Sequence, residues 1–430
     1  LRGLVGSEMC IRDRFLFAVH SRKMHEMTGV IIIGAGQAAA SFVAKFRTLD
    51  QKTALTIYGD EPEIPYQRPP LSKKYATGDM VKAQLYLRPE TWYSDQNIRL
   101  KTSVKVKSID RTKRTVHLSD GTTDKWTKLM IATGSRVREL PQSVTNNLSG
   151  LHYVRTLEDA DHFGEVLKPG RRIVIVGGGY IGLEAAAVCA QKGMKVTLVE
   201  AAVRILQRVA CEETSAWFKR LHLEEGVDII EGVGLSHFEG QGGKLTRAVL
   251  SDKSVIDAEV AVVGIGILPN TELAEACELV VENGIVVNGV CQTNDPDIYA
   301  AGDCAVTDYN GISTRLESVP NAIDQATVAG IHAATGAAPN YVAKPWFWSD
   351  QFDVKLQIAG LNRRYTSVVT RPGKTSRSMA HFYYHGDTLL AIDAMNAPSV
   401  YMIGKRLLEA GKTIPPEHAA DVEFNLKSLL

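Results

Sequence analysis

Two glycine-rich clusters have the spacing of turns that bind a pyrophosphate. The first, Gly34-Ala35-Gly36-Gln37-Ala38-Ala39, follows the apolar run 30–33, and the second, 177–182, follows the apolar run 173–176. In such a turn the first glycine permits the bend, the second admits the phosphates, and a third small residue lets helix and strand pack closely. The helix that follows directs free N–H groups at the phosphates. The expected contacts are Gly34, Gly36, Ala39, Gly177, Gly179, Ile181 and Gly182.

An acidic residue follows each glycine turn. Glu200 ends an apolar run about 20 residues past the second turn, where a carboxylate can accept hydrogen bonds from both ribose hydroxyls and repel a 2′-phosphate. This position predicts NADH as the donor rather than NADPH. Arg204 could accommodate a phosphate, but we expect it to pack on the adenine. In the first cluster Asp60 or Glu61 holds the equivalent place, and Asp60 is preferred.

Two further short motifs decide which nucleotides bind. Ala132-Thr133-Gly134 and Ala300-Ala301-Gly302-Asp303 each follow an apolar run. An aspartate placed after a buried strand can accept hydrogen bonds from a ribityl chain. Two nucleotide folds could mean two NAD sites, and these motifs favour one FAD and one NAD.

The elements that must position these motifs repeat along the chain. Each cluster lies between an apolar strand and an alanine-rich helix, expected over 38–49 and 181–192, and each helix leads to another strand, over 54–58 and 195–200. Short apolar runs of this kind suit a parallel sheet covered on both faces. The sequence therefore predicts an α/β protein with two Rossmann-like dinucleotide-binding domains.

The remaining segments predict β structure and a smaller third domain. Strands are expected over 104–110, 115–119, 128–132, 255–263 and 298–301, with a hairpin turn at Asp120-Gly121. Alternating runs at 376–384 and 388–394, followed by helical patterns at 399–410 and 415–424, indicate an α+β C-terminal domain. The expected boundaries are 27–134 with 264–343 for the FAD domain, 135–263 for the NAD domain, and 344–430 for the C-terminal domain.

Composition excludes several classes of protein. The 430 residues are 45% apolar and carry a formal net charge of +1, which argues against a nucleic-acid binder that depends on bulk basic charge. No apolar run is long enough for a transmembrane helix. Six scattered cysteines lack metal-ligand spacing, so we expect no metal site and reduced thiols in a cytoplasmic setting. Residues 1–26 look unlike the rest, and we expect them to be non-native, with a start at Met24 or Met27.

The order of the motifs resembles that of FAD-dependent ferredoxin reductases that serve Rieske oxygenases and bacterial P450s. The resemblance covers about residues 28 to 395 and fades toward the C-terminus. Beyond the glycine motifs, the segments that carry it are 65–73 (PYQRPPLSK), 155–160 (RTLEDA), 264–270 (GIGILPN), 317–322 (ESVPNA) and 345–351 (PWFWSDQ).

The resemblance implies roles for individual residues. Lys73 is expected near flavin N5, Glu184 and Tyr180 where nicotinamide meets flavin, Gly266 in the nicotinamide cleft, and Trp348 near the isoalloxazine. Lys73, Glu184 and Trp348 are the expected catalytic residues. The implied FAD contacts are Ala38, Asp60, Arg68, Lys73, Val104, Arg155, Asp303 and Val319. Further expected cofactor contacts are Ala132, Thr133, Gly134, Gly302, Glu317 and Ser318.

The resemblance also separates this chain from related disulfide reductases. From Ile11 through Val188 there is no cysteine, so no thiol from those positions can lie beside the flavin. The implied activity is transfer of electrons from NADH through FAD to a [2Fe–2S] ferredoxin, by a monomer or homodimer. Candidates for a basic docking patch are Arg363, Arg364, Lys374 and Arg377.

Two alternatives stay open. One is an NADH oxidase or monodehydroascorbate-type reductase with a small acceptor. The other is a non-catalytic redox-sensing module like apoptosis-inducing factor.

Overall fold

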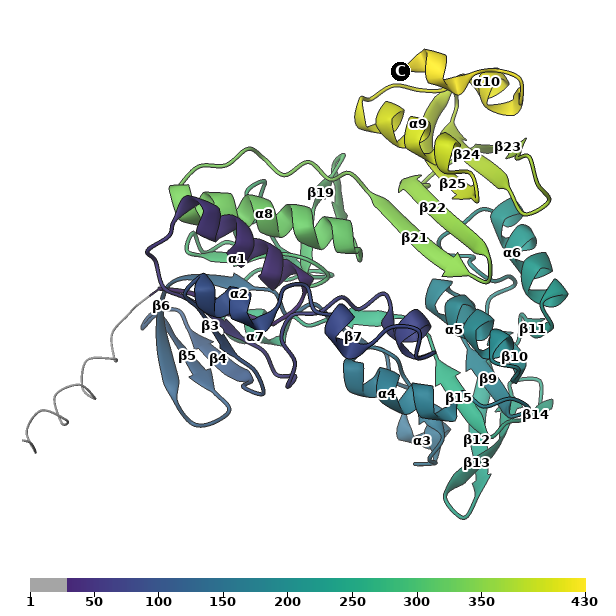
Figure 1. Cartoon of the computed structure of the whole chain (residues 1–430), viewed down its shortest axis with the longest axis horizontal. Helices are drawn as coiled ribbons and strands as arrows, with labels where there is room; N and C mark the ends of the chain where they lie inside the picture. Colours follow the sequence, from purple (N-terminus) through teal and green to yellow (C-terminus); the bar gives the residue numbers. More distant parts are fainter. Residues whose placement is uncertain (1–28) are drawn as a thin grey trace, which may run out of the picture.

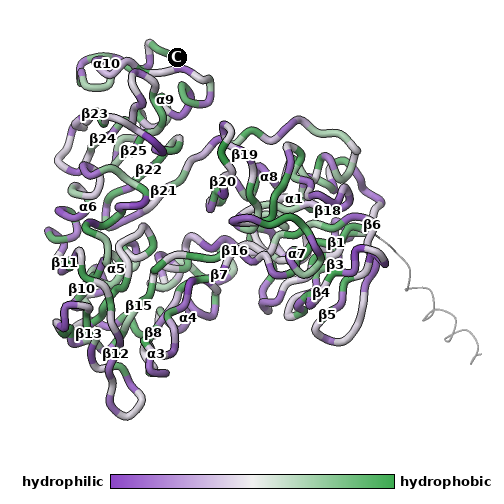
Figure 2. The backbone as a smooth tube through the Cα atoms, turned by 180° about the vertical axis from the view of Figure 1, so that it is seen from behind, coloured by the Kyte–Doolittle hydropathy of each residue, from purple (hydrophilic) through white to green (hydrophobic). Residues whose placement is uncertain are grey.

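The computed structural model describes residues 29–430, so the segment expected to be non-native lies outside the described residues. Figure 1 shows one lobe at the left, a second at the lower right, and a C-terminal domain packed above the second lobe. We call the left lobe the first unit and the lower right lobe the second unit. Apolar residues concentrate in the central strands and helices of each part (Figure 2).

The first unit is built on a parallel sheet that ends in a glycine turn. Its strand order is β3-β2-β1-β6-β18, and β6 continues into an antiparallel meander with β5 and β4. The strands are β1 (Gly29–Ile33), β2 (Leu55–Tyr58), β3 (Ile98–Lys101), β4 (Val106–Asp110), β5 (Thr115–Leu118), β6 (Thr123–Ile131) and β18 (Ile298–Ala300). Strand β6 begins before the expected residue 128 because its first half pairs with β5.

The second unit repeats this topology. Its order is β11-β10-β9-β15-β8, all parallel, with a meander of β12, β13 and β14. The strands are β8 (Leu151–His152), β9 (Arg172–Val176), β10 (Lys195–Glu200), β11 (Val227–Glu231), β12 (Leu235–Gln241), β13 (Lys244–Leu250), β14 (Val255–Asp257) and β15 (Val260–Val263). The fifth strand of this sheet, β8, precedes β9 in the sequence. The fifth strand of the first sheet, β18, comes from far downstream of the other strands.

Helices and short elements complete the two units, and two short strands cross between them. The first unit contains α1 (Gln37–Leu49), α2 (Glu90–Asp95), α7 (Glu272–Ala276) and α8 (Val319–Thr335), and the second contains α4 (Leu157–Val166), α5 (Tyr180–Gln191) and α6 (Glu212–Glu224). Short elements are η1 (Leu71–Tyr75), η2 (Lys82–Gln84), α3 (Gln142–Thr145), β17 (Ile285–Val286), β19 (Ala305–Tyr309) and β20 (Ile312–Thr314). The two crossings between the units, β7 (Ser135–Val137) and β16 (Ile267–Pro269), pair antiparallel.

The C-terminal domain is an antiparallel sheet covered by helices, as the sequence predicts. The sheet order is β21-β22-β25-β24-β23. Its elements are β21 (Trp346–Gln351), β22 (Val354–Gly360), β23 (Ser367–Pro372), β24 (Met379–His385), β25 (Thr388–Met395), α9 (Pro398–Glu409), α10 (Pro416–Ala420) and η3 (Leu426–Leu429). Val354, Leu356 and Met395 join the core of the second unit, which fixes this domain on that unit.

The expected helix over 415–424 was wrong in length. Helix α10 stops at Ala420. The Arg371 guanidinium donates to the carbonyl oxygens of His418, Ala419, Val422 and Phe424, at 3.0 to 3.2 Å, and also to that of Asp421. Because one guanidinium binds successive carbonyls, it stabilises a non-helical turn where the pattern predicts continued helix.

Candidate functional site

The first glycine of each turn lies against the neighbouring strand. Gly34 and Gly177 have φ of +104° and +108°, which favours glycine. A Cβ on Gly34 would lie 2.2 Å from the Ala132 carbonyl oxygen, and one on Gly177 would lie 2.4 Å from that of Gly264. Both turns therefore need glycine for the bend and for close contact with the adjacent strand.

The second glycine of each turn faces open space. A Cβ on Gly36 or Gly179 would have no heavy atom within 4 Å. Helices α1 and α5, which begin here, have no side-chain cap, whereas Thr156, Cys211 and Ser318 cap other helices. Uncapped N–H groups beside open space fit a bound pyrophosphate at each turn.

The third small residue closes each turn. A Cβ on Gly182 would lie 1.9 Å from the Gly177 carbonyl oxygen, and its counterpart Ala39 is fully buried. Ala38 and Gly302 are also neighbours, since a Cβ on Gly302 would contact Ala38 and Ala322 at 3.5 and 3.4 Å. The structure thus joins the first turn to the start of α8.

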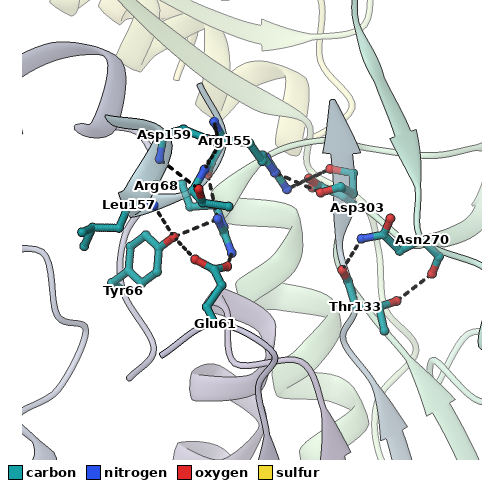
Figure 3. Close-up of polar contacts among 11 residues, drawn as sticks. Glu61, Tyr66, Arg68, Thr133, Arg155, Leu157, Asp159, Asn270 and Asp303 are labelled. Carbon is teal, nitrogen blue, oxygen red and sulfur yellow. Dashed lines mark hydrogen bonds and ion pairs between the residues drawn. The ribbon is translucent and has the colours of Figure 1, made fainter. Parts of the chain in front are cut away.

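Residues expected at the flavin converge from four segments of the chain. Arg155 donates from Nη2 to the Asp303 carboxylate at 3.1 Å (Figure 3). Ser135 Oγ donates to the same oxygen at 2.7 Å. Arg68 donates to the Arg155 carbonyl oxygen at 2.7 Å and to Glu61 at 2.5 Å. This network orients Asp303, and it commits Glu61 to an ion pair.

The Ala-Thr-Gly motif is held by the segment after β16. Thr133 Oγ1 donates to the Asn270 carbonyl oxygen at 2.7 Å, and the Asn270 amide donates back to the Thr133 carbonyl oxygen at 2.9 Å (Figure 3). Ala132 donates its N–H to Ile33, beside Gly34. These bonds place Ala132, Thr133 and Gly134 next to the first turn.

The two acids expected at the riboses differ in their contacts. Glu200 accepts the Gly178 N–H at 2.6 Å and the Ala202 N–H at 2.7 Å, so its carboxylate braces the second turn. Asp60 is exposed, and Val104 donates its N–H to the adjacent Gly59 carbonyl oxygen. Glu61 is committed to Arg68, and Asp60 stays the predicted ribose ligand.

Arg204 is turned toward its own loop. Its guanidinium donates to Ser215 and to the carbonyl oxygens of Ala210 and Cys211, at 3.0 and 3.3 Å. Its expected contact with adenine stays a prediction, and these bonds give it a role in holding the loop before α6.

A buried ion pair lies between η1 and α5. Lys73 Nζ is 2.8 Å from Glu184 Oε1 and 3.6 Å from Asp350 Oδ2. Glu184 is 3% exposed, and it also accepts the Ser349 hydroxyl at 2.7 Å and the Asp350 N–H at 3.3 Å. Burial raises the pKa of Glu184, while Lys73 and the donors from β21 oppose that rise.

Aromatic rings line the same region. Tyr180 packs against Phe347, with ring centroids 5.1 Å apart, and burial raises the pKa of its hydroxyl. Trp348 packs against Trp346 at 5.6 Å and Phe347 at 6.3 Å. Of the neighbouring rings on β21, it is Phe347 that contacts Tyr180, and sequence reasoning gave no role to Phe347.

The other expected contacts take structural partners. Ser318 caps α8 by accepting the Asn321 N–H at 3.3 Å, directly before Val319, and Glu317 pairs with Arg315 at 2.5 Å. Gly266, with φ of +106°, accepts the Arg138 N–H at 2.9 Å. Ile181 is 49% exposed beside the second turn. Their contacts with cofactor remain predictions.

Residues 28–326 match the family model described as "Pyridine nucleotide-disulphide oxidoreductase". The chain belongs to this family. Residues 346–430 match a second model, "Reductase C-terminal". FAD and NAD(P)H are accordingly its cofactors. The glycine turns, uncapped helices and oriented Asp303 fit these groups.

Relatives of known name support the resemblance drawn from the motifs. The chain is 37% identical to putidaredoxin reductase of Pseudomonas putida, over 95% of this chain and 98% of the relative. It is 38% identical to a ferredoxin–NAD(P)+ reductase of Sphingomonas, over 93% and 97%. A crystal structure of a covalent putidaredoxin reductase–putidaredoxin complex matches with a TM-score of 0.90 and 37% identity, over 93% and 97%. The expected resemblance and fold class are confirmed.

Several polar residues of the site were not singled out from sequence. Ser135 and Asn270 hold the flavin-side motifs, and Ser349, Gln351 and His222 extend the Glu184 cluster. Ser349 and Gln351 lie two apart on a strand, which places them on one face. That alternation was the available signal for these two, and His222 had none.

Proposed function

We propose that this chain carries electrons from NADH through FAD to a [2Fe–2S] ferredoxin in a Rieske oxygenase or cytochrome P450 system. FAD, when bound, converts a two-electron hydride donor into a source of single electrons. The names of the relatives support the class of acceptor, and the acid Glu200 supports NADH. A cytoplasmic location and a monomer or homodimer are part of the same proposal.

Among residues 29–430 no helix has the length and apolar character needed to span a bilayer.

The observation that carries the proposal is the buried Lys73–Glu184 pair at the contact of three parts of the chain. Lys73 comes from the first unit, Glu184 from the second, and Ser349 from the C-terminal domain. A cation held there can stabilise the negative charge of a reduced flavin ring, and the neighbouring open turns bind the two nucleotides.

The cysteines argue against thiol chemistry at the site. Cys189, Cys211, Cys277, Cys291 and Cys304 are all buried, and burial raises the pKa of each thiol, to about 12 for Cys189 and Cys291. A thiolate is the reactive form, so none of these five is suited to attack a disulfide or peroxide.

The expected docking patch is only partly available. Arg377 pairs with Glu225 at 2.5 Å and also with Asp353, so its charge is neutralised internally. Arg363, Arg364 and Lys374 are exposed, although Arg363 donates to Thr314 at 2.9 Å. These three cations are the better candidates for steering an acidic ferredoxin.

The test is NADH-dependent reduction of cytochrome c with and without an added [2Fe–2S] ferredoxin. Strong dependence on ferredoxin is expected, with NADH preferred over NADPH. Consumption of NADH without any effect of ferredoxin would indicate that the electron acceptor is oxygen or a small molecule. No oxidation of NADH by the FAD-loaded protein would favour a non-catalytic role.

A further inference from the structure

A chain of buried hydrogen bonds runs from the Lys73–Glu184 pair into the protein. Ser349 Oγ lies 2.7 Å from Glu184 Oε1, Gln351 Nε2 lies 3.1 Å from Ser349 Oγ, and Gln351 Oε1 lies 2.8 Å from His222 Nε2. Ser349, Gln351 and His222 are each 0% exposed. The chain links α5, β21 and α6, so it crosses the contact between the second unit and the C-terminal domain twice.

The direction of every donor in this chain follows from Glu184. An ionised carboxylate only accepts, so the single Ser349 proton must point to Glu184. Ser349 then accepts from the Gln351 amide nitrogen, which turns the Gln351 carbonyl oxygen toward His222. His222 must therefore donate from Nε2, leaving Nδ1 without a proton.

The surroundings of His222 agree with this tautomer. Nδ1 is buried and has no hydrogen-bond partner among the described residues. A proton on Nδ1 would be a buried N–H group without an acceptor, which costs free energy. The tautomer that leaves Nδ1 without a proton avoids this cost. Burial lowers the pKa of His222 to about 4, so the ring is neutral, and Glu225 is the charged group acting on it.

The opposite direction requires a proton on Oε1 of Glu184, the oxygen that Ser349 contacts. Glu184 would then donate to Ser349, Ser349 to the Gln351 oxygen, and the Gln351 amide to His222 Nε2. That arrangement forces the His222 proton onto the unpartnered Nδ1. The packing around His222 therefore disfavours a proton on Oε1 of Glu184, three hydrogen bonds away, and keeps Ser349 a donor to that oxygen.

We propose that His222 and Gln351 are positioning residues that keep Glu184 an anion aimed at Lys73. This inference rests on the proposed function for the placement of Lys73 and Glu184 at the flavin. The charged groups facing Glu184 are Lys73 from η1 and Asp350 from β21, and Lys355 from β22 pairs with Asp350 at 2.5 Å. The donor chain adds to the effect of Lys73, because hydrogen bonds to the charged form of an acid favour that form.

The direct test is the tautomer of His222 in the wild-type protein. ¹⁵N NMR of the histidine rings, with His222→Gln to assign the signal, is expected to show a neutral ring protonated at Nε2 at neutral pH. A ring protonated at Nδ1 in the wild type would overturn the proposal.

The second test is titration of the Glu184 carboxyl in the oxidised, FAD-loaded protein. Its infrared band is assigned by difference with Glu184→Gln. Gln351→Leu and His222→Leu are expected to raise its pKa by about 1 unit, because each change removes the donors that hold the Ser349 hydroxyl toward the carboxylate. His222→Gln keeps an N–H donor toward Gln351 and is expected to restore most of the shift.

His381→Leu is the matched control. His381 is another buried histidine on the contact between α6 and the C-terminal sheet, but it bonds to Thr214 and not to this chain. Its loss is expected to leave the Glu184 titration unchanged. An unchanged titration in Gln351→Leu, or an equal shift in His381→Leu, would overturn the proposal. Neither test uses ferredoxin, so failure of the proposed electron acceptor is seen separately.

Discussion

The two glycine turns share one backbone and differ in what covers the helix that each begins. Helix α1 packs on α8 through apolar residues such as Phe42, Phe46 and Ala326, within its own unit. Helix α5 carries Glu184, which meets Lys73 from the first unit and Ser349 from the C-terminal domain. The turn is thus a phosphate-binding motif common to both units. The chemistry of each unit depends on which side chains from other parts of the chain contact the helix that follows the turn.

The acids after the turns differ in the same way. Asp60 is free for a ligand, whereas Glu200 already accepts two backbone N–H groups of its own turn. A carboxylate with fixed orientation is better suited to discriminate between two cofactors. In the proposed assignment the first unit holds FAD as a resident cofactor, and the second must select NADH as a substrate.

The largest expected effect separates the first from the second glycine of each turn. Gly34→Ala and Gly177→Ala place a Cβ against a strand carbonyl at a positive φ, and we expect no folded FAD-loaded protein from either. Gly36→Ala and Gly179→Ala enter open space, so the fold is expected to persist. Gly36→Ala should lose FAD, and Gly179→Ala should raise KM for NADH about ten-fold.

Thermal unfolding and flavin content of the four purified variants check this prediction. The Gly36 and Gly179 variants act as controls for the other two. Normal folding of Gly177→Ala would contradict the assigned contact with Gly264.

The next effect concerns the ion pair that α5 has and α1 lacks. Lys73→Met leaves Glu184 buried without its cation, and we expect a loss of about 4 kcal/mol in the free energy of unfolding. The double variant Lys73→Met/Glu184→Gln should recover most of that loss, because no charge is left unpaired. Denaturant unfolding of both single variants and the double variant gives the coupling energy. Additive losses would show that the two side chains are not a pair.

Two buried ionisable groups, Asp393 and His381, lie where the C-terminal sheet meets α6, and they predict that the free energy of unfolding depends on pH. Asp393 on β25 is 1% exposed, accepts from Thr214 at 2.8 Å and from Tyr383, and burial raises its pKa to about 6. Unfolded aspartate titrates near 4, so the folded form binds more protons between pH 4 and 6. Asp393 therefore makes the free energy of unfolding fall as pH rises through this range, by about 3 kcal/mol at most.

His381 acts with the opposite sign. Burial lowers its pKa to about 4, so below about pH 6.5 the unfolded form binds more protons and stability is lost as pH falls. The two slopes oppose each other in the wild type. Relative to the wild type, Asp393→Asn should gain stability with rising pH between 4 and 6, and His381→Gln should lose it. Denaturant unfolding across this range checks both, and slopes of equal sign would contradict the assignment.

The smallest expected effect compares the two acids. Glu200→Gln keeps one of the two accepting oxygens and removes the charge that repels a 2′-phosphate, so the preference for NADH should fall about ten-fold, or about 1.4 kcal/mol. The measurement is the ratio of kcat/KM for NADH and NADPH. Asp60→Asn is the matched variant of the first unit, expected to weaken FAD retention and leave this ratio alone. An unchanged ratio in Glu200→Gln would locate the selection elsewhere.

The sequence by itself determined the repeated strand–turn–helix units and their cofactors. A positive-φ glycine, an open second glycine and a small third residue are local requirements, and they leave a readable pattern at Gly34–Ala39 and Gly177–Gly182. The helices over 37–49 and 180–191 begin within one residue of the expected positions, since the same turn sets their first residue. Alternation also predicted the antiparallel C-terminal sheet.

Only the tertiary structure decided which side chains meet. Ser349 and Glu184 lie 165 positions apart, and Arg155 and Asp303 lie 148 apart. No local period links such residues, because their contact depends on how the two units and the C-terminal domain pack. The tertiary structure also turned Arg204 and Arg377 toward internal partners and brought Phe347, rather than Trp348, to Tyr180. Buried polar groups need partners, and the fold alone determines which partners are near enough to satisfy them.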